Sequence, residues 1–259
     1  MVPLDVARAV RNREAGYRGL DLSFFGRDFE PRRFVRSEIS ATAHLFSAGL
    51  GASTLIVGFA GTKFRLFGPI WQILQIIDDR EFDFLLLADE RRRHFESGVP
   101  GFGNSMRNIA AAVAALASKR GYRKMITYGT SMGGFPALRA GSLIGADRAI
   151  SIGGRYAWDI RRMQDGGDTI VAFDPLCACR TPGAGESIAI FSEGNAEDAS
   201  NDARMRTVLP QLRSIAVPGH KHNALHAATQ RGNACRLYEI LFNLDEQPAT
   251  ADLVALCTA

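Results

Sequence analysis

The chain has 259 residues, of which 46% are hydrophobic and 22% charged, so it is long enough to bury a large core. The net charge of +4 is small, and the arginines are dispersed among acids, which argues against nucleic-acid binding. The four cysteines are too scattered for a disulfide framework, and Cys177 and Cys179 lack the spacing of zinc ligands. We therefore expect reduced thiols, with no metal and no cofactor.

The amino-terminal segment carries acidic and arginine residues where a signal peptide would have an apolar stretch. No apolar run in the chain approaches the roughly 20 residues that a membrane helix requires. We therefore expect a cytoplasmic protein with no segment inserted in a membrane.

Strand-like and helix-like segments alternate along the chain. Partial alternation of apolar residues over 36–50 predicts one or two antiparallel edge strands. Short apolar runs rich in β-branched residues predict buried strands at 53–59, 82–89, 124–128, 148–152, 187–191 and 212–217. Helical patterns are expected at 69–77, from 106 onward with Ser105 as N-cap, at 135–143, and from about 223 to 244 with a break at 232–233.

Strands that alternate with helices are typical of the α/β class. The pattern predicts a three-layer α/β/α sandwich with a mostly parallel sheet covered on both faces. The chain shows no internal repeat and no linker rich in proline, glycine or serine. We therefore expect a single domain over residues 1–259, with residues 153–186 as an irregular excursion from it.

The most informative motif is Gly-x-Ser-x-Gly, centred on Ser131, between a predicted strand and a predicted helix. A serine at such a tight turn must hold a strained backbone, and Gly129 and Gly133 remove the side chains that would obstruct it. The N–H groups at the start of the following helix favour negative charge at the same place. Ser131 is therefore the predicted nucleophile, and an ordinary strand-to-helix turn is the alternative.

A serine hydroxyl needs a base within hydrogen-bond reach. The chain has five histidines, and three of them follow the last predicted strand: His220, His222 and His226. A loop that leaves the carboxyl end of a parallel strand lies at the same sheet edge as the serine turn. His222 is preferred because a helix begins directly after it, and His220 and His226 stay as alternatives. His44 lies in the edge region, and His94 lies in a polar run.

A carboxylate that orients the base should follow the preceding strand. The segment after that strand offers four acids: Glu193, Glu197, Asp198 and Asp202. Asp198 is preferred because a short carboxylate a few residues past the strand end can accept the Nδ1–H of His222. Glu193 and Glu197 stay as alternatives, whereas Asp202 is expected in the helix beyond the loop.

The order serine, acid, histidine, with all three at strand ends, resembles the α/β-hydrolase superfamily over roughly residues 50–244. The elbow sequence from Tyr128 to Gly134 is similar to that of small bacterial serine hydrolases. The resemblance implies an oxyanion hole made by the backbone N–H of Met132 and by a second N–H, from Ala60 or Phe59. It also implies that residues 153–186 form a modest lid.

The activity that the resemblance implies is that of a serine hydrolase. Such an enzyme would cleave a carboxylic ester, or a related acyl bond, of a small molecule through an acyl-enzyme. An acyltransferase or thioesterase with the same triad is one alternative. A binding protein that keeps the fold without turnover is another, although the intact Gly-x-Ser-x-Gly motif favours an enzyme.

Overall fold

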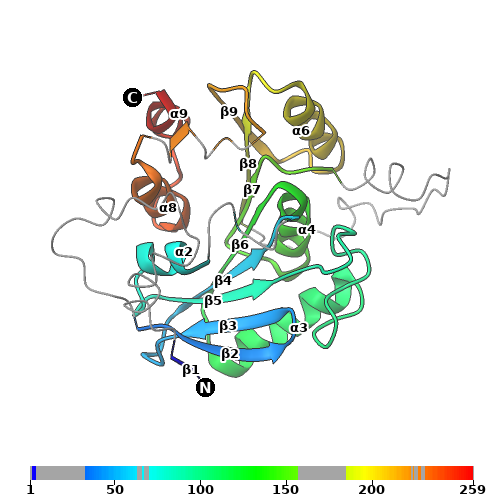
Figure 1. Ribbon diagram of the computed structural model, residues 1–259, viewed down its shortest axis with the longest axis vertical. Helices are drawn as coiled ribbons and strands as arrows, with labels where there is room; N and C mark the ends of the chain where they lie inside the picture. Colours follow the sequence, from blue (N-terminus) through cyan, green and yellow to red (C-terminus); the bar gives the residue numbers. More distant parts are fainter. Residues whose placement is uncertain are drawn as a thin grey trace, which may run out of the picture.

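The computed structural model describes residues 2–3, 33–62, 66, 70–156, 185–222, 224, 227–228 and 231–258. Within these residues, one nine-stranded sheet has the order β1-β2-β3-β5-β4-β6-β7-β8-β9 (Figure 1). The strands are β1 (Val2–Pro3), β2 (Val35–Ser40), β3 (Ala43–Ser47), β4 (Thr54–Phe59), β5 (Phe82–Leu87), β6 (Lys124–Thr130), β7 (Arg148–Ile152), β8 (Glu186–Ser192) and β9 (Arg213–Val217).

The sheet is mostly parallel, as the sequence predicts. Strands β4 to β9 run parallel to one another, whereas β1, β2 and β3 pair antiparallel and join the sheet at β5. Every residue of β4 is buried, while β2 alternates between half-buried and exposed positions. This difference follows from their places, because a central parallel strand is covered on both faces and an edge strand is not.

Helices cover both faces of the sheet (Figure 1). One face carries α2 (Ile70–Ile76), α8 (Ala234–Phe242) and α9 (Thr250–Thr258), and the other carries α3 (Met106–Arg120), α4 (Gly134–Ile144) and α6 (Ala196–Val208). Successive residues of β4 pack into different cores: Ile56 joins the cluster that includes Leu237 of α8, and Val57 joins the one that includes Ile109 of α3. The three-layer α/β/α sandwich is therefore confirmed.

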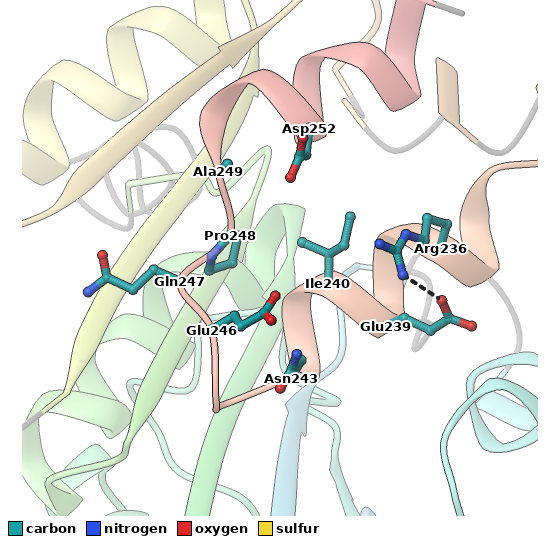
Figure 2. Close-up of a pocket in the computed structure, with 9 residues that line it drawn as sticks. All are labelled: Arg236, Glu239, Ile240, Asn243, Glu246, Gln247, Pro248, Ala249 and Asp252. Atoms are coloured by element: carbon teal, nitrogen blue, oxygen red, sulfur yellow. Dashed lines mark hydrogen bonds and ion pairs between the residues drawn. The ribbon is translucent and has the colours of Figure 1, made fainter.

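The connection between α8 and α9 is tied to the amino-terminal edge of the sheet. Arg148, the first residue of β7, donates from Nη1 to the carbonyls of Leu241 at 3.0 Å and Asn243 at 2.5 Å. A cavity of about 210 Å³ lies beside this connection, and its lining includes Arg236 and Asp252 (Figure 2). The carboxyl ends of the parallel strands, where the α/β architecture places ligands, lie at the opposite edge.

The segment expected to form a lid lies almost wholly outside the described residues, since only residues 153–156 and 185–186 of it are described. In the part of the chain that the structure describes, no helix is long and apolar enough to cross a membrane. The cytoplasmic location and the single-domain boundaries stay predictions.

Candidate active site

Strand β6 ends at Thr130, and Ser131 opens a 3₁₀ turn (Ser131–Gly133) that leads directly into α4. The φ angle of Ser131 is 53°, in the left-handed region that residues with a side chain rarely adopt. A Cβ atom on Gly129 would lie 2.0 Å from the Gly133 carbonyl oxygen, and one on Gly133 would lie 2.0 Å from that of Phe59. The two glycines of the motif are therefore required by close packing, and the turn holds Ser131 in a strained conformation.

Three predicted site residues meet at the carboxyl edge of the sheet. Nε2 of His222 lies 2.9 Å from Oγ of Ser131, and its Nδ1 lies 2.5 Å from Oδ1 of Asp198. The Asp198 side chain is buried, whereas that of His222 is 30% exposed. Since one ring nitrogen faces the hydroxyl and the other faces a carboxylate, the imidazole can take a proton from Ser131 while Asp198 holds the opposite N–H.

Asp198 lies in the first turn of α6, and the expectation that it lies in a loop was wrong. The helix begins at Ala196, with Asn195 as its N-cap, and the side-chain oxygen of Asn195 accepts the backbone N–H of Asp198 at 3.0 Å. An asparagine N-cap stabilises the start of a helix because it satisfies an N–H that has no intrahelical acceptor. The cap therefore places the carboxylate on a rigid element.

The other three acids of this segment have different surroundings. Oε1 of Glu197 lies 3.2 Å from Nε of Arg155, in a partly exposed ion pair. Asp202 accepts the hydroxyl of Ser214 at 2.7 Å, and burial raises its pKa. Glu193 is exposed. The geometry therefore favours Asp198, of the four, as the partner of His222.

The histidine loop is held by neighbouring backbone. The hydroxyl of Ser192 donates to the carbonyl of Lys221 at 2.6 Å. Gly153 has a φ of 52°, and a Cβ atom there would lie 2.4 Å from the carbonyl oxygen of His222. His220 is exposed, with Nδ1 3.3 Å from the carbonyl oxygen of Gly194, and His226 lies outside the described residues.

The backbone around Met132 is arranged so that its N–H has a fixed direction. The carbonyl of Ser131 accepts the N–H of Arg155 at 3.0 Å and also that of Gly134. Because the peptide between Ser131 and Met132 is planar and trans, its N–H points away from its anchored carbonyl. The backbone N–H of Met132 therefore remains the first expected donor of the oxyanion hole.

The second expected donor needs a correction. The N–H of Ala60 donates to the carbonyl of Leu87 at 2.9 Å, so it extends the pairing of β4 with β5. It can bind an oxyanion only by giving up that bond. Phe59 is the last residue of β4, which pairs on both sides, so its N–H faces a neighbouring strand as well. The second donor is therefore expected from the part of the loop after β4 that lies beyond Ala60.

The sequence did not predict that His94 is buried near the serine turn. It follows β5 at the carboxyl edge, is only 2% exposed, and lies beside Met132 and Arg155. The pKa of His94 is lowered from its ordinary value of 6.5 to about 4, chiefly because the ring is buried and also because Arg155 is positively charged, while the Met132 carbonyl opposes the shift. The ring is therefore neutral at pH 7.

This burial predicts a pH-dependent stability. Between pH 6.5 and about 4, the unfolded chain binds a proton at His94 that the folded chain does not, so the free energy of unfolding should fall as the pH falls. One proton corresponds to a slope of about 1.4 kcal/mol per pH unit. Across this window, the free energy of unfolding measured with urea should fall with pH more steeply, by up to that amount, in the wild type than in His94→Asn, whose asparagine tolerates a positive φ. Equal slopes in the two proteins would contradict the prediction.

In the described ranges, no group of three or more histidine, cysteine, aspartate or glutamate residues could hold a metal ion. No family model matches the sequence, and no curated protein matches it. The similarity of this chain to known proteins is therefore found at the level of the fold.

Many solved structures share this architecture. Fluorophosphonate-binding serine hydrolase F of Staphylococcus aureus matches with a TM-score of 0.55 at 8% identity, covering 81% of this chain and 99% of that one. Esterase Pf2001 of Pyrococcus furiosus matches with a TM-score of 0.52 at 10% identity, covering 80% of this chain and 91% of that one. The capsule O-acetyltransferase of Neisseria meningitidis serogroup A matches with a TM-score of 0.51 at 12% identity, covering 85% of this chain and 100% of that one. The chain therefore has the α/β-hydrolase fold, as the resemblance implies.

Proposed function

We propose that this protein is a serine hydrolase that cleaves a carboxylic ester, or a related acyl bond, of a small molecule. The observation that carries the proposal is the continuous path from the Ser131 hydroxyl through both ring nitrogens of His222 to the Asp198 carboxylate, at 2.9 and 2.5 Å. The strained φ of Ser131 supports it, because such strain is concentrated at functional sites.

The reaction would proceed in two halves. Oγ of Ser131 attacks the carbonyl carbon while Nε2 of His222 takes its proton, and the resulting oxyanion binds the N–H of Met132 and a second N–H from the loop after β4. Collapse of this intermediate expels the alcohol, which takes the proton from His222, and leaves an acyl-enzyme. Water then attacks the acyl group, again with His222 as base, and releases the acid and the free serine. Asp198 accepts the Nδ1–H throughout.

An acyltransferase that uses the same groups is the second candidate. It differs only in the acceptor, since an alcohol in place of water attacks the acyl-enzyme. A matched structure described as a capsule O-acetyltransferase supports this candidate, and those described as a serine hydrolase and an esterase support hydrolysis. Product analysis with a small activated ester, with and without added alcohol, separates the two.

Labelling with a fluorophosphonate probe tests the proposed nucleophile. Ser131→Ala should abolish labelling and ester turnover and leave the fold intact, because only the hydroxyl is removed. Ser118→Ala is the matched control, since Ser118 is an exposed serine on α3. If the Ser131→Ala protein is labelled as strongly as the wild type, Ser131 is not the nucleophile.

A further inference from the structure

The loop from Asp89 to Glu96, which follows β5, has an unusual backbone. Three of the four non-glycine residues with positive φ in the described part of the chain lie in it: Arg92 at 53°, His94 at 54° and Phe95 at 63°. The fourth is Ser131, at 53°. Residues with a side chain persist in this conformation only where their surroundings hold them.

The carboxylate of Asp89 holds the loop from within. Its oxygens accept the backbone N–H groups of Arg91 at 3.0 Å, Arg93 at 2.7 Å and Phe95 at 2.8 Å. Asp89 itself is buried, so these hydrogen bonds are shielded from competing water. The loop is therefore a rigid element, built around one side chain.

Contacts with β4 and α4 also hold this loop. The ring of Phe95 packs edge-on against that of Phe59, the last residue of β4, with centroids 5.1 Å apart. Glu96 forms a nearly buried ion pair with Arg139 of α4. His94 directly precedes the two residues that make these contacts.

The ring of His94 makes no well-formed hydrogen bond in the free protein. Its nitrogens fall short of hydrogen-bond geometry, although the carbonyl of Met132 and the charge of Arg155 lie beside the ring. An unpaired buried polar group destabilises a fold, and most such groups in native proteins are paired. Stability therefore does not explain a strained, buried histidine at this place.

We propose that His94 is a positioning residue for the oxyanion hole, and that it acts through the carbonyl of Met132. The proposal rests on the proposed function. The carbonyl of Ser131 is already anchored by the N–H of Arg155, at 3.0 Å. During the reaction, a ring N–H of neutral His94 closes on the next carbonyl, that of Met132, so that the N–H between the two carbonyls is held toward the substrate.

The hydrogen bond from His94 to the Met132 carbonyl is expected to form fully only during the reaction. Hydrogen bonds in catalytic sites are often long in the free enzyme and shorten in the transition state. As the Met132 N–H binds the oxyanion, the adjoining peptides polarise, and the Met132 carbonyl becomes a better acceptor for the ring. His94 would thus raise kcat without contacting the substrate.

Variants of His94 separate a positioning role in catalysis from a general role in supporting the fold. His94→Gly suits a positive φ but removes the ring, so it should lower kcat about 10- to 100-fold, short of the loss of a whole oxyanion donor, and change KM less than about threefold. His94→Asn and His94→Gln carry an amide N–H near the places of Nδ1 and Nε2, and one of them should recover most of the lost kcat. Arg92→Gly relieves a similar backbone strain at an exposed position of the loop and should leave kcat unchanged.

A second measurement uses the unaltered protein. When a trifluoromethyl ketone forms its adduct with the wild-type protein, the ring N–H resonance of His94 should move downfield in a spectrum of ¹⁵N-histidine-labelled protein. An unmoved resonance would overturn the proposal, as would a His94→Gly protein with kcat within twofold of wild type. So would a loss of kcat that neither amide variant restores. A wild type that neither labels nor turns over esters contradicts the proposed function instead.

Discussion

Replacing His222 with alanine is expected to lower kcat by at least about 10³, because the members of a catalytic triad act as a unit. Nε2 of His222 is 2.9 Å from the Ser131 hydroxyl, so its removal leaves the nucleophile without a base. KM should change little, since the imidazole acts on the proton in the transition state. Steady-state kinetics on one small activated ester measures both constants.

The two histidines nearest His222 in the sequence, His220 and His226, provide the controls. His220 is exposed and its Nδ1 lies 3.3 Å from the carbonyl oxygen of Gly194, away from the serine. His220→Ala should therefore keep kcat within a few-fold of the wild type, and His226→Ala should also matter far less than His222→Ala. If His220→Ala were inactive and His222→Ala active, the base would have been assigned to the wrong residue.

Most of the sheet could be predicted from local patterns. The predicted strand at 148–152 has the same bounds as β7, and the predicted edge strands appear as β2 and β3. These elements are predictable because burial of a strand requires a run of apolar residues, whatever its neighbours are. Helix α9 was missed, since its nine residues, Thr250–Thr258, form a short, weakly patterned segment after a proline-containing connection.

The site could be predicted in part, for a similar reason. A glycine-flanked serine and a histidine after a strand are visible in the sequence, and the parallel sheet brings the ends of its strands together. The direction of a backbone N–H and the path of a loop are not visible. The N–H of Ala60 is used by strand pairing, and His94 is buried because the Asp89 carboxylate folds its loop inward. Both depend on contacts between distant residues.

Asp198→Asn is expected to lower kcat by up to about 10⁴ while the fold is kept. The asparagine side chain has nearly the same shape, and the N-cap bond from Asn195 uses only the backbone N–H of residue 198. The Nδ1 of His222, however, would then face an amide that donates a hydrogen bond. The ring would carry its proton on Nε2, where it cannot accept the proton of Ser131, and its charged form would lose a carboxylate partner at 2.5 Å.

A panel of neighbouring acids tests this assignment. Glu193→Gln and Glu197→Gln should keep turnover near that of the wild type, because Glu193 is exposed and Glu197 forms a partly exposed pair with Arg155. Asp202→Asn should lower stability rather than kcat, since the amide has one acceptor oxygen where Asp202 uses two, for the Ser214 hydroxyl and for Nε of Arg206. Near wild-type turnover in Asp198→Asn, with collapse in either glutamine variant, would mean that a glutamate is the acid. The roles of Ser131 and His222 would survive that result, because the ring nitrogen that faces the serine does not depend on which carboxylate holds the other.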